Sequence, residues 1–269
     1  MTALGVWVQA KSPPSNLVGE AEFKSIFNFD SVTPMAYGAV GDGTTDDKAA
    51  ILSALTTGKT VVIDRSYGIG SQLTIADDNW SMTRSGDGEI IMLTGVGQFT
   101  NTTVGSKYAT NSCGIYNNGY DGFIMHGVKI RLGGSPSADS VCIPIAVRDS
   151  TKSHIYRCEA TGFKKGNGLI SIDSCFDGSV NDNYLHDCAA NGATYGQLSG
   201  VNVDDNRVSS VASKRMSISS NHIVNLTCDA TFIAAHGYQT DGINISMNES
   251  SSHVIKGNMI DTVGEGIDC

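Results

Sequence analysis

Three carboxyl side chains near the end of the sequence sit in a repeated segment. Asp241-Gly-Ile-Asn-Ile245 and Glu265-Gly-Ile-Asp-Cys269 superimpose without gaps and begin 24 residues apart. If each segment is a strand of a stacked repeat, Asp241 and Glu265 occupy equivalent positions on neighbouring strands, roughly 4.8 Å apart. Glycoside hydrolysis uses two carboxyl groups separated by ~5 to 5.5 Å or ~6.5 to 9.5 Å. Asp241 with Glu265 or Asp268 is therefore a candidate catalytic pair.

Three further residues are predicted to bind the substrate of this pair. His236 lies five residues before Asp241, and its pKa near neutrality suits it to hydrogen-bonding hydroxyls or to proton transfer. Tyr238 can stack on a sugar ring. Strand alternation predicts that Asn244 points outward, as Asp268 does, while the flanking isoleucines point to the core. The alternative, in which all of these are ordinary solvated loop and turn residues, stays open.

Internal repetition predicts the architecture that would position these side chains. The pattern polar-Gly-apolar-x-apolar also occurs at Asp121 to Met125 and at Ser199 to Val203, and the spacings suggest coils of about 26 residues. A second pattern, apolar-x-x-Asn-x-apolar, is expected to place asparagines at turns, where they tolerate left-handed geometry and bond along the stack. These asparagines are Asn183, Asn206, Asn221 and Asn258. Short strands that share one core in this way form a solenoid.

A glycine-punctuated turn, Tyr37-Gly-Ala-Val-Gly-Asp-Gly-Thr-Thr-Asp-Asp47, leads into a short apolar stripe that predicts a helix near residues 45–56. Thr44, Thr45 or Asp46 is expected to cap this helix. No convincing helical period follows Leu55. The turn does not fit a calcium loop, because Asp47 and Ser53 stand where glycine and glutamate are needed. It does not fit a phosphate loop either.

This turn resembles the opening of the pectate-lyase-like proteins of the right-handed parallel β-helix class. The resemblance implies an all-β fold, a single-stranded right-handed parallel β-helix with a short N-terminal capping helix. It also implies polysaccharide as the substrate, as in bacteriophage tailspikes and depolymerases, pectinases and alginate epimerases. Gln239-Thr-Asp-Gly-Ile243 resembles the Asn-Thr-Asp-Gly motif of polygalacturonase-type hydrolases. The next coil of that family carries Asp-Asp-Cys, near which Gly264-Glu265 stands here, so Asp241 and Glu265 match in type. The first aspartate of that pair is lost, and the motif's asparagine is replaced by Gln239.

Composition excludes several other classes of function. The net charge of −9 argues against nucleic acid and anionic membranes as partners. Seven cysteines, an odd number without Cys-x-x-Cys pairs, predict neither a zinc site nor a disulfide framework. They are expected to be buried free thiols in a chain folded in a reducing cytoplasm. No metal and no cofactor is predicted.

Residues 1–29 are predicted to be an N-terminal arm or linker, and residues 30–269 the β-helix domain. The start of the chain lacks the basic leading region of a signal peptide, and no stretch is long enough to span a membrane. These features fit a virion component released by lysis. The sequence stops at the beginning of a coil, which predicts that the chain is a fragment or that something else covers this end.

The sequence therefore predicts a bacteriophage tailspike-type depolymerase, a homotrimer by analogy, that hydrolyses a bacterial capsular or O-antigen polysaccharide. Two alternatives remain. A polysaccharide lyase or epimerase would carry histidine, tyrosine and cations on one row of strands. A non-catalytic adhesin or structural virion protein would carry a flat polar ladder with exposed aromatic residues.

Overall fold

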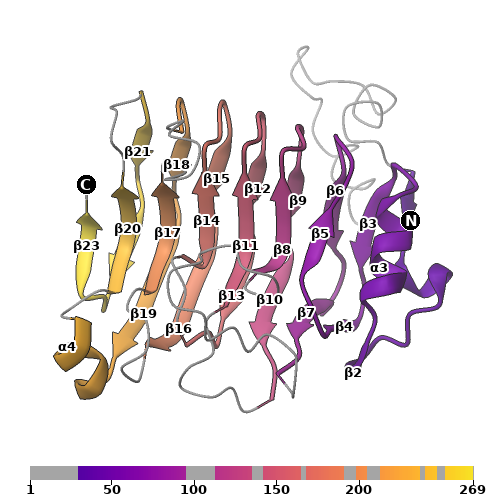
Figure 1. Ribbon diagram of the computed structural model, residues 1–269, viewed down its shortest axis with the longest axis horizontal. Helices are drawn as coiled ribbons and strands as arrows, with labels where there is room; N and C mark the ends of the chain where they lie inside the picture. The colour runs from indigo at the N-terminus through magenta and orange to yellow at the C-terminus, as the bar shows by residue number, and fades with distance from the viewer. Residues whose placement is uncertain are drawn as a thin grey trace, which may run out of the picture.

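The computed structural model describes residues 30–94, 113–134, 142–164, 168–190, 198–204, 213–236, 240–246 and 252–268. The predicted arm, Tyr238, Asn206 and Cys269 lie outside these ranges. Within them the chain forms three sheets in which every pairing between strands is parallel. The strands follow one another along the long axis in chain order, from β3 at one end to β23 at the other (Figure 1).

Each turn of the solenoid contributes one strand to each sheet, except the first described turn, which contributes β1 and β2 but no strand of sheet C. Sheet A contains β1 (Ser31–Val32), β3 (Thr60–Ile63), β6 (Ser81–Arg84), β9 (Ile124–His126), β12 (His154–Tyr156), β15 (Ser179–Asn181), β18 (Ser217–Ser219) and β21 (Val254–Lys256). Sheet B contains β2 (Asp42–Asp46), β4 (Ser66–Ile69), β7 (Glu89–Met92), β10 (Lys129–Leu132), β13 (Glu159–Thr161), β16 (Tyr184–Ala190), β19 (His222–Cys228) and β22 (Met259–Asp261). Sheet C contains β5 (Leu73–Ile75), β8 (Cys113–Asn118), β11 (Ile143–Arg148), β14 (Ile170–Asp173), β17 (Leu198–Asp204), β20 (Thr240–Ser246) and β23 (Glu265–Asp268).

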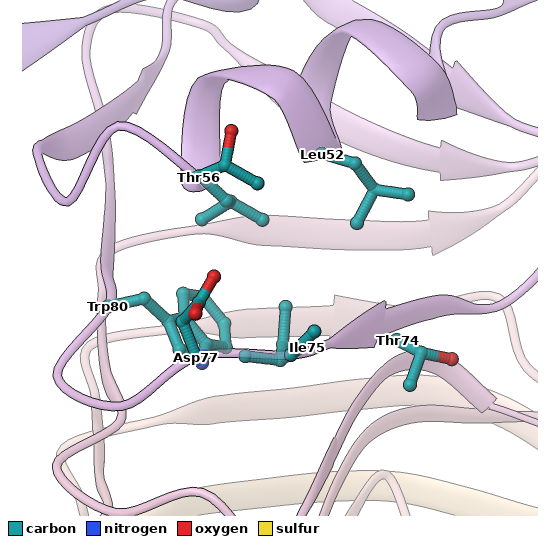
Figure 2. Close-up of a pocket in the computed structure, with 8 residues that line it drawn as sticks. Leu52, Thr56, Thr74, Ile75, Asp77 and Trp80 are labelled. Atoms are coloured by element: carbon teal, nitrogen blue, oxygen red, sulfur yellow. The ribbon is translucent and has the colours of Figure 1, made fainter.

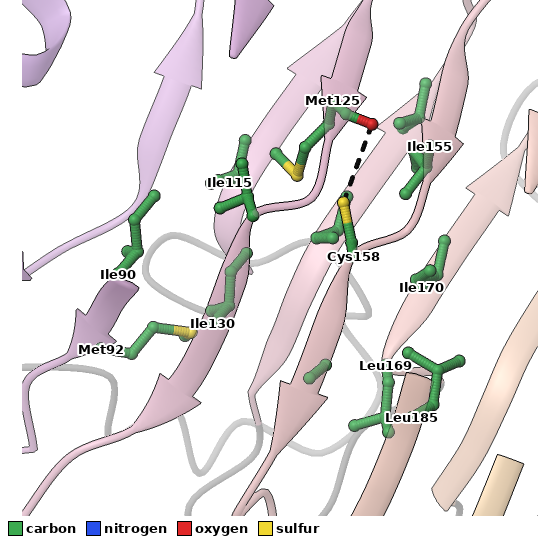
Figure 3. Close-up of a cluster of buried hydrophobic side chains, with 14 of the residues drawn as sticks. Ile90, Met92, Ile115, Met125, Ile130, Ile155, Cys158, Leu169, Ile170 and Leu185 are labelled. Carbon is green, nitrogen blue, oxygen red and sulfur yellow. Dashed lines mark hydrogen bonds between the residues drawn. The ribbon is translucent and has the colours of Figure 1, made fainter. Parts of the chain in front are cut away.

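The core is a stack of apolar side chains that runs along the inside of all three sheets. Equivalent positions on successive strands line up, as in the row Ile115, Ile145, Ile170, Val201 and Ile243. All five are fully buried. Figure 3 shows part of this stack. Because no single coil can bury its own inner face, stacking provides the hydrophobic stabilisation. Ile267, next in the row, belongs to the last strand and is exposed.

The spacing between coils is not constant, which corrects the expectation of about 26 residues. Asn244 and Asp268 pair across 24 residues, whereas Ser199 and Asp241 pair across 42. The extra residues lie between strands. The structure also separates Asp121 to Met125 from the other repeats, because Ile124–His126 is strand β9 of sheet A. A short sequence pattern can match strands of two different sheets, because all three sheets are built from short apolar strands.

The second repeat forms an asparagine ladder at the turn between sheets A and B. Asn183 donates from Nδ2 to Asn221 Oδ1 at 2.9 Å, and Asn221 donates to Asn258 Oδ1 at 2.9 Å. The same amides also donate to the backbone carbonyls of Ile155 and Val180. The ladder therefore satisfies polar groups that the tight turn would leave unpaired inside the solenoid.

The left-handed residue of this turn is not the asparagine itself, contrary to the prediction. Asp182, Ser220 and Gly257, each directly before a ladder asparagine, have φ values of 57°, 57° and 63°. The asparagine is the next residue along the chain, and its side chain supplies the hydrogen bonds of the ladder. The expectation of bonding along the stack is thus confirmed, while that of left-handed geometry at the asparagines is wrong.

The predicted helix is present as α3 (Lys48–Leu55), which lies at the N-terminal end of the stack (Figure 1). Ile51, Ala54 and Leu55 are buried. Asp47 takes the N-cap position, without a capping side-chain bond, and its carboxylate accepts hydrogen bonds from the Val40 and Gly41 amides. Of the three predicted capping residues, Asp46 does contact the helix start: its Oδ1 accepts a hydrogen bond from the amide of Lys48, the first helical residue, at 3.2 Å. Before it, η1 (Pro34–Tyr37) forms a single 3₁₀ turn.

A second helix, α4 (Ala230–His236), contradicts the expectation of no helix after Leu55. Asp229 begins it by accepting a hydrogen bond from the Phe232 amide at 2.7 Å, and the Phe232 side chain is fully buried. The aspartate was a sequence signal for a helix start, but seven residues are too few to show a helical period.

The reactivity of the cysteine thiols tests the packing of the solenoid core. Burial raises the pKa of Cys142, Cys158, Cys175 and Cys188 to about 12. Since the thiolate is the reactive form, these four thiols are expected to resist a thiol reagent at neutral pH in the folded protein. Of the six cysteines that the structure describes, Cys228, which is half-buried, should react first. Mass mapping of labelled peptides before and after denaturation measures this order, and early labelling of Cys158 would contradict the packing.

Candidate active site

The predicted carboxyl residues meet on sheet C, on strands β20 and β23. Asp241 pairs in register with Glu265, and Asn244 pairs with Asp268, as the repeat predicted. Asn244 Nδ2 lies 3.5 Å from Asp241 Oδ2 and 3.3 Å from Asp268 Oδ2. One amide thus contacts two carboxyl groups. Those two oxygens are at most about 7 Å apart, a limit that allows either geometry of glycoside hydrolysis.

Regular strand alternation would place Asp241 with Ile243 on the inner face, yet its carboxylate contacts the outward Asn244. The chain therefore departs from alternation around Gly242, between the paired positions Asp241 and Ile243. A Cβ atom on Gly242 would stand 2.6 Å from the Gly266 carbonyl oxygen. Glycine is required by this close approach of successive coils.

The carboxyl groups differ in their surroundings. Asp241 is 3% exposed and Asn244 is 4% exposed, and Asp241 Oδ2 also accepts a hydrogen bond from Ser199 Oγ at 3.1 Å. Glu265 and Asp268 are exposed. A buried and an exposed carboxyl group side by side can take different protonation roles, as acid and base catalysis requires.

Further polar residues of sheet C continue this row and were missed by sequence reasoning. Ser171 and Asn202 occupy the positions equivalent to Asn244 on β14 and β17. Both are buried, and Asn202 Nδ2 makes no hydrogen bond. Tyr116 and Arg148 contact each other farther along the sheet, where burial raises the pKa of Tyr116 and Arg148 opposes that effect. Only the stacking register, which the unequal coil lengths conceal, could have revealed them.

Among the residues that the structure describes, acidic side chains on or beside the strands of sheet C outnumber basic ones. Asp149, Asp173, Asp241, Glu265 and Asp268 lie on or beside its strands. Arg148 lies next to them, with its Nε 3.2 Å from Asp149 Oδ2. An acidic surface repels anionic ligands and accepts neutral or cationic ones.

The two remaining predicted residues are placed differently. His236 is the last residue of α4, outside the strands that bear the carboxyl groups, and Tyr238 lies outside the described residues. Within the described ranges, no group of three His, Cys, Asp or Glu side chains could hold a metal ion. In the same ranges, no helix is long and apolar enough to cross a membrane.

A small pocket lies at the other end of the solenoid and does not take part in this site. It has a volume of about 40 Å³ between α3 and β5, with Leu52, Ile75 and Trp80 in its walls (Figure 2). Ligand pockets usually measure roughly 300–1,000 Å³. The pocket is too small for a sugar residue.

Comparison with known proteins concerns the fold. No protein-family model and no curated protein matches this sequence. A Parabacteroides merdae protein provisionally named a glycosyl hydrolase aligns over 84% of this chain and 97% of its own, with 10% identity and a TM-score of 0.49. A surface adhesin of Streptococcus pneumoniae aligns over 85% of this chain and 61% of its own, with 14% identity and a TM-score of 0.46.

Phage proteins are also among the aligned structures. The N-terminal fragment of bacteriophage phi29 gene product 12 aligns over 85% of this chain and 43% of its own, with 17% identity and a TM-score of 0.42. Two phage tailspike proteins align as well. These likenesses assign no chemistry to the chain. Its own three parallel sheets, wound around one apolar stack, make it a parallel β-helix.

Proposed function

We propose that this chain is a right-handed parallel β-helix of the phage tailspike class, capped by α3, that hydrolyses glycosidic bonds of a bacterial surface polysaccharide. It would act as a homotrimer in the virion. The observation that supports this most is the contact of one amide, Asn244, with both Asp241 and Asp268 on the outer face of the solenoid. Two neighbouring carboxyl groups, one to donate a proton and one to accept it, are what an inverting glycoside hydrolase uses.

Each carboxyl group has a role in this proposal. Asp241, in its buried setting, donates a proton to the glycosidic oxygen as the bond from that oxygen to the anomeric carbon breaks. Asp268 accepts a proton from the water whose oxygen bonds to the anomeric carbon. Glu265, exposed and in register with Asp241, can replace Asp268 in that role. Asn244 holds the two carboxyl groups in position.

The acidic face of sheet C favours a neutral or amino-sugar glycan as the substrate. It also favours hydrolysis of the glycosidic bond over elimination. A lyase needs a uronic acid, whose carboxylate this face would repel, and cations to stabilise the charge that develops. Arg215, just before β18, is engaged by Asp177 at 2.5 and 2.8 Å. The Arg148 guanidinium likewise lies against Asp149.

The test is incubation of the protein with purified capsular and O-antigen polysaccharides, sorted into neutral, amino-sugar and uronate-containing sets. New reducing ends are measured alongside ultraviolet absorbance. Hydrolysis predicts reducing ends without absorbance, from the neutral or amino-sugar sets. Absorbance that rises with the reducing ends, from the uronate set, would show a lyase and would refute the proposal.

A second candidate function is glycan binding without cleavage, by an adhesin or a structural virion protein. The burial of Asp241 and Asn244 favours it, because a catalytic acid must reach its substrate. In that case no surface polysaccharide would yield reducing ends, although the protein would still bind one.

A further inference from the structure

Sheet B carries a cluster of rings on its outer face, away from the sheet C carboxyl groups. Tyr184 and His186 are two residues apart on β16 and so share a face, and their rings stack with centroids 3.8 Å apart at 16°. His222, the register partner of Tyr184 on β19, has its ring centroid 5.1 Å from that of Tyr184. Tyr184, His186 and His222 are called the aromatic platform below.

The platform is accessible in part. Tyr184 is 40% exposed, and among the described residues Tyr37, at 37%, is the other exposed tyrosine. An exposed aromatic ring that stacks on its neighbours offers a flat apolar surface of fixed orientation. Such surfaces lose little conformational entropy when they bind a ligand.

Carboxylates hold the platform in place from two sides. His186 Nε2 lies 3.3 Å from Glu159 Oε1, and His186 Nδ1 lies 2.7 Å from Asp187 Oδ2. Lys129 Nζ lies 2.8 Å from Glu159 Oε1, and Asn225 donates to Asp187 Oδ1 at 2.6 Å. The imidazole ring that supports Tyr184 therefore cannot rotate without breaking these contacts.

The neighbouring polar and basic groups favour the ionised form of the Glu159 and Asp187 carboxylates. Burial raises the pKa of Glu159, but hydrogen bonds with Lys129 and His186 outweigh it and lower that pKa. Hydrogen bonds from Asn225 and His186 lower the pKa of Asp187. Arg131 forms a bidentate pair with Glu89 nearby. The rim thus offers ionised hydrogen-bond acceptors without a strong net field.

We propose that the aromatic platform is a separate glycan-binding site, which holds one pyranose ring of an uncharged sugar against Tyr184. A pyranose presents aliphatic C–H groups on its faces and hydroxyl groups around its rim. The C–H groups would pack on the phenol ring, and the Asp187 and Glu159 carboxylates would accept hydroxyl hydrogens. The inference deepens the proposed function, since it rests on a glycan being the ligand, but it does not require cleavage.

The test uses saturation-transfer NMR with the methyl glycosides of glucose, galactose, mannose and N-acetylglucosamine, in an Asp241→Asn background so that hydrolysis does not contribute. At least one glycoside is expected to receive magnetisation at its ring C–H protons. Tyr184→Ala should weaken that binding roughly tenfold or more. Tyr184→Phe, which keeps the ring, should retain it, and Tyr37→Ala should bind as the parent does.

Two results would overturn the proposal that the aromatic platform binds a glycan. One is the absence of transfer to all four glycosides, and the other is unchanged binding by Tyr184→Ala. Failure of the platform is separate from failure of the proposed function, because the first is read from binding and the second from reducing ends released by the unmodified protein.

Discussion

Replacing Asp241 with asparagine is expected to lower the rate of glycan cleavage by roughly 10²–10⁴-fold, the usual contribution of a general acid or base. The substitution keeps the shape of the side chain and removes its proton. Asp268→Asn should have a similar effect, unless Glu265 replaces it as the base. The measurement is kcat and KM from reducing ends, with the loss expected in kcat.

Asp87→Asn is the matched control for these variants. Asp87 is exposed and lies in the turn between β6 and β7, outside sheet C. The same chemical change there should leave the rate unaltered. If Asp241→Asn and Asp268→Asn both cleaved as fast as the Asp87 variant, the assignment of the site to β20 and β23 would be wrong.

Asn221→Ala is expected to destabilise the protein by roughly 2–4 kcal/mol, because it leaves several buried polar groups without partners. Its Nδ2 donates to the Val180 carbonyl and to Asn258 Oδ1. Its Oδ1 accepts from the backbone amide and the side-chain amide of Asn183. Truncation therefore opens the ladder on both sides at once, and thermal unfolding followed by circular dichroism measures the loss.

Two further variants sharpen this prediction. Asn221→Asp keeps the shape but sets a carboxylate oxygen against the Val180 carbonyl and Asn258 Oδ1, so it should destabilise at least as much as alanine. Asn118→Ala, at an exposed position on β8, should change the free energy of unfolding by no more than about 0.5 kcal/mol. Equal stability of the Asn221 and Asn118 variants would mean that the ladder does not stabilise the solenoid.

The sequence predicted the fold well where the repeats are evenly spaced. The ladder residues Asn183, Asn221 and Asn258 recur every 37 or 38 residues, and the pairing of Asp241 with Glu265 follows from two adjacent, identical patterns. In both cases the pattern repeats within one sheet, so a gapless superposition finds the true register.

Prediction failed where the register depends on contacts between coils. The match at Asp121 combined strands of two different sheets, because short apolar strands look alike in sequence. The departure from alternation between Asp241 and Ile243 coincides with the close approach of Gly242 to the next coil, and alternation within a strand cannot reveal it. The aromatic platform and the Glu159 carboxylate beside it come from three coils of unequal length, because Glu159 pairs with Tyr184 and Tyr184 pairs with His222.

Hydrolysis by paired carboxyl groups is tested most directly by cleavage in water enriched in heavy oxygen. The proposed mechanism predicts that each new reducing end carries one heavy oxygen atom, as seen by mass spectrometry of the fragments, and that the Asp241→Asn, Asp268→Asn double variant releases none. Fragments that carry no label and have lost one water, with an unsaturated sugar at the new end, would instead show elimination and contradict the mechanism.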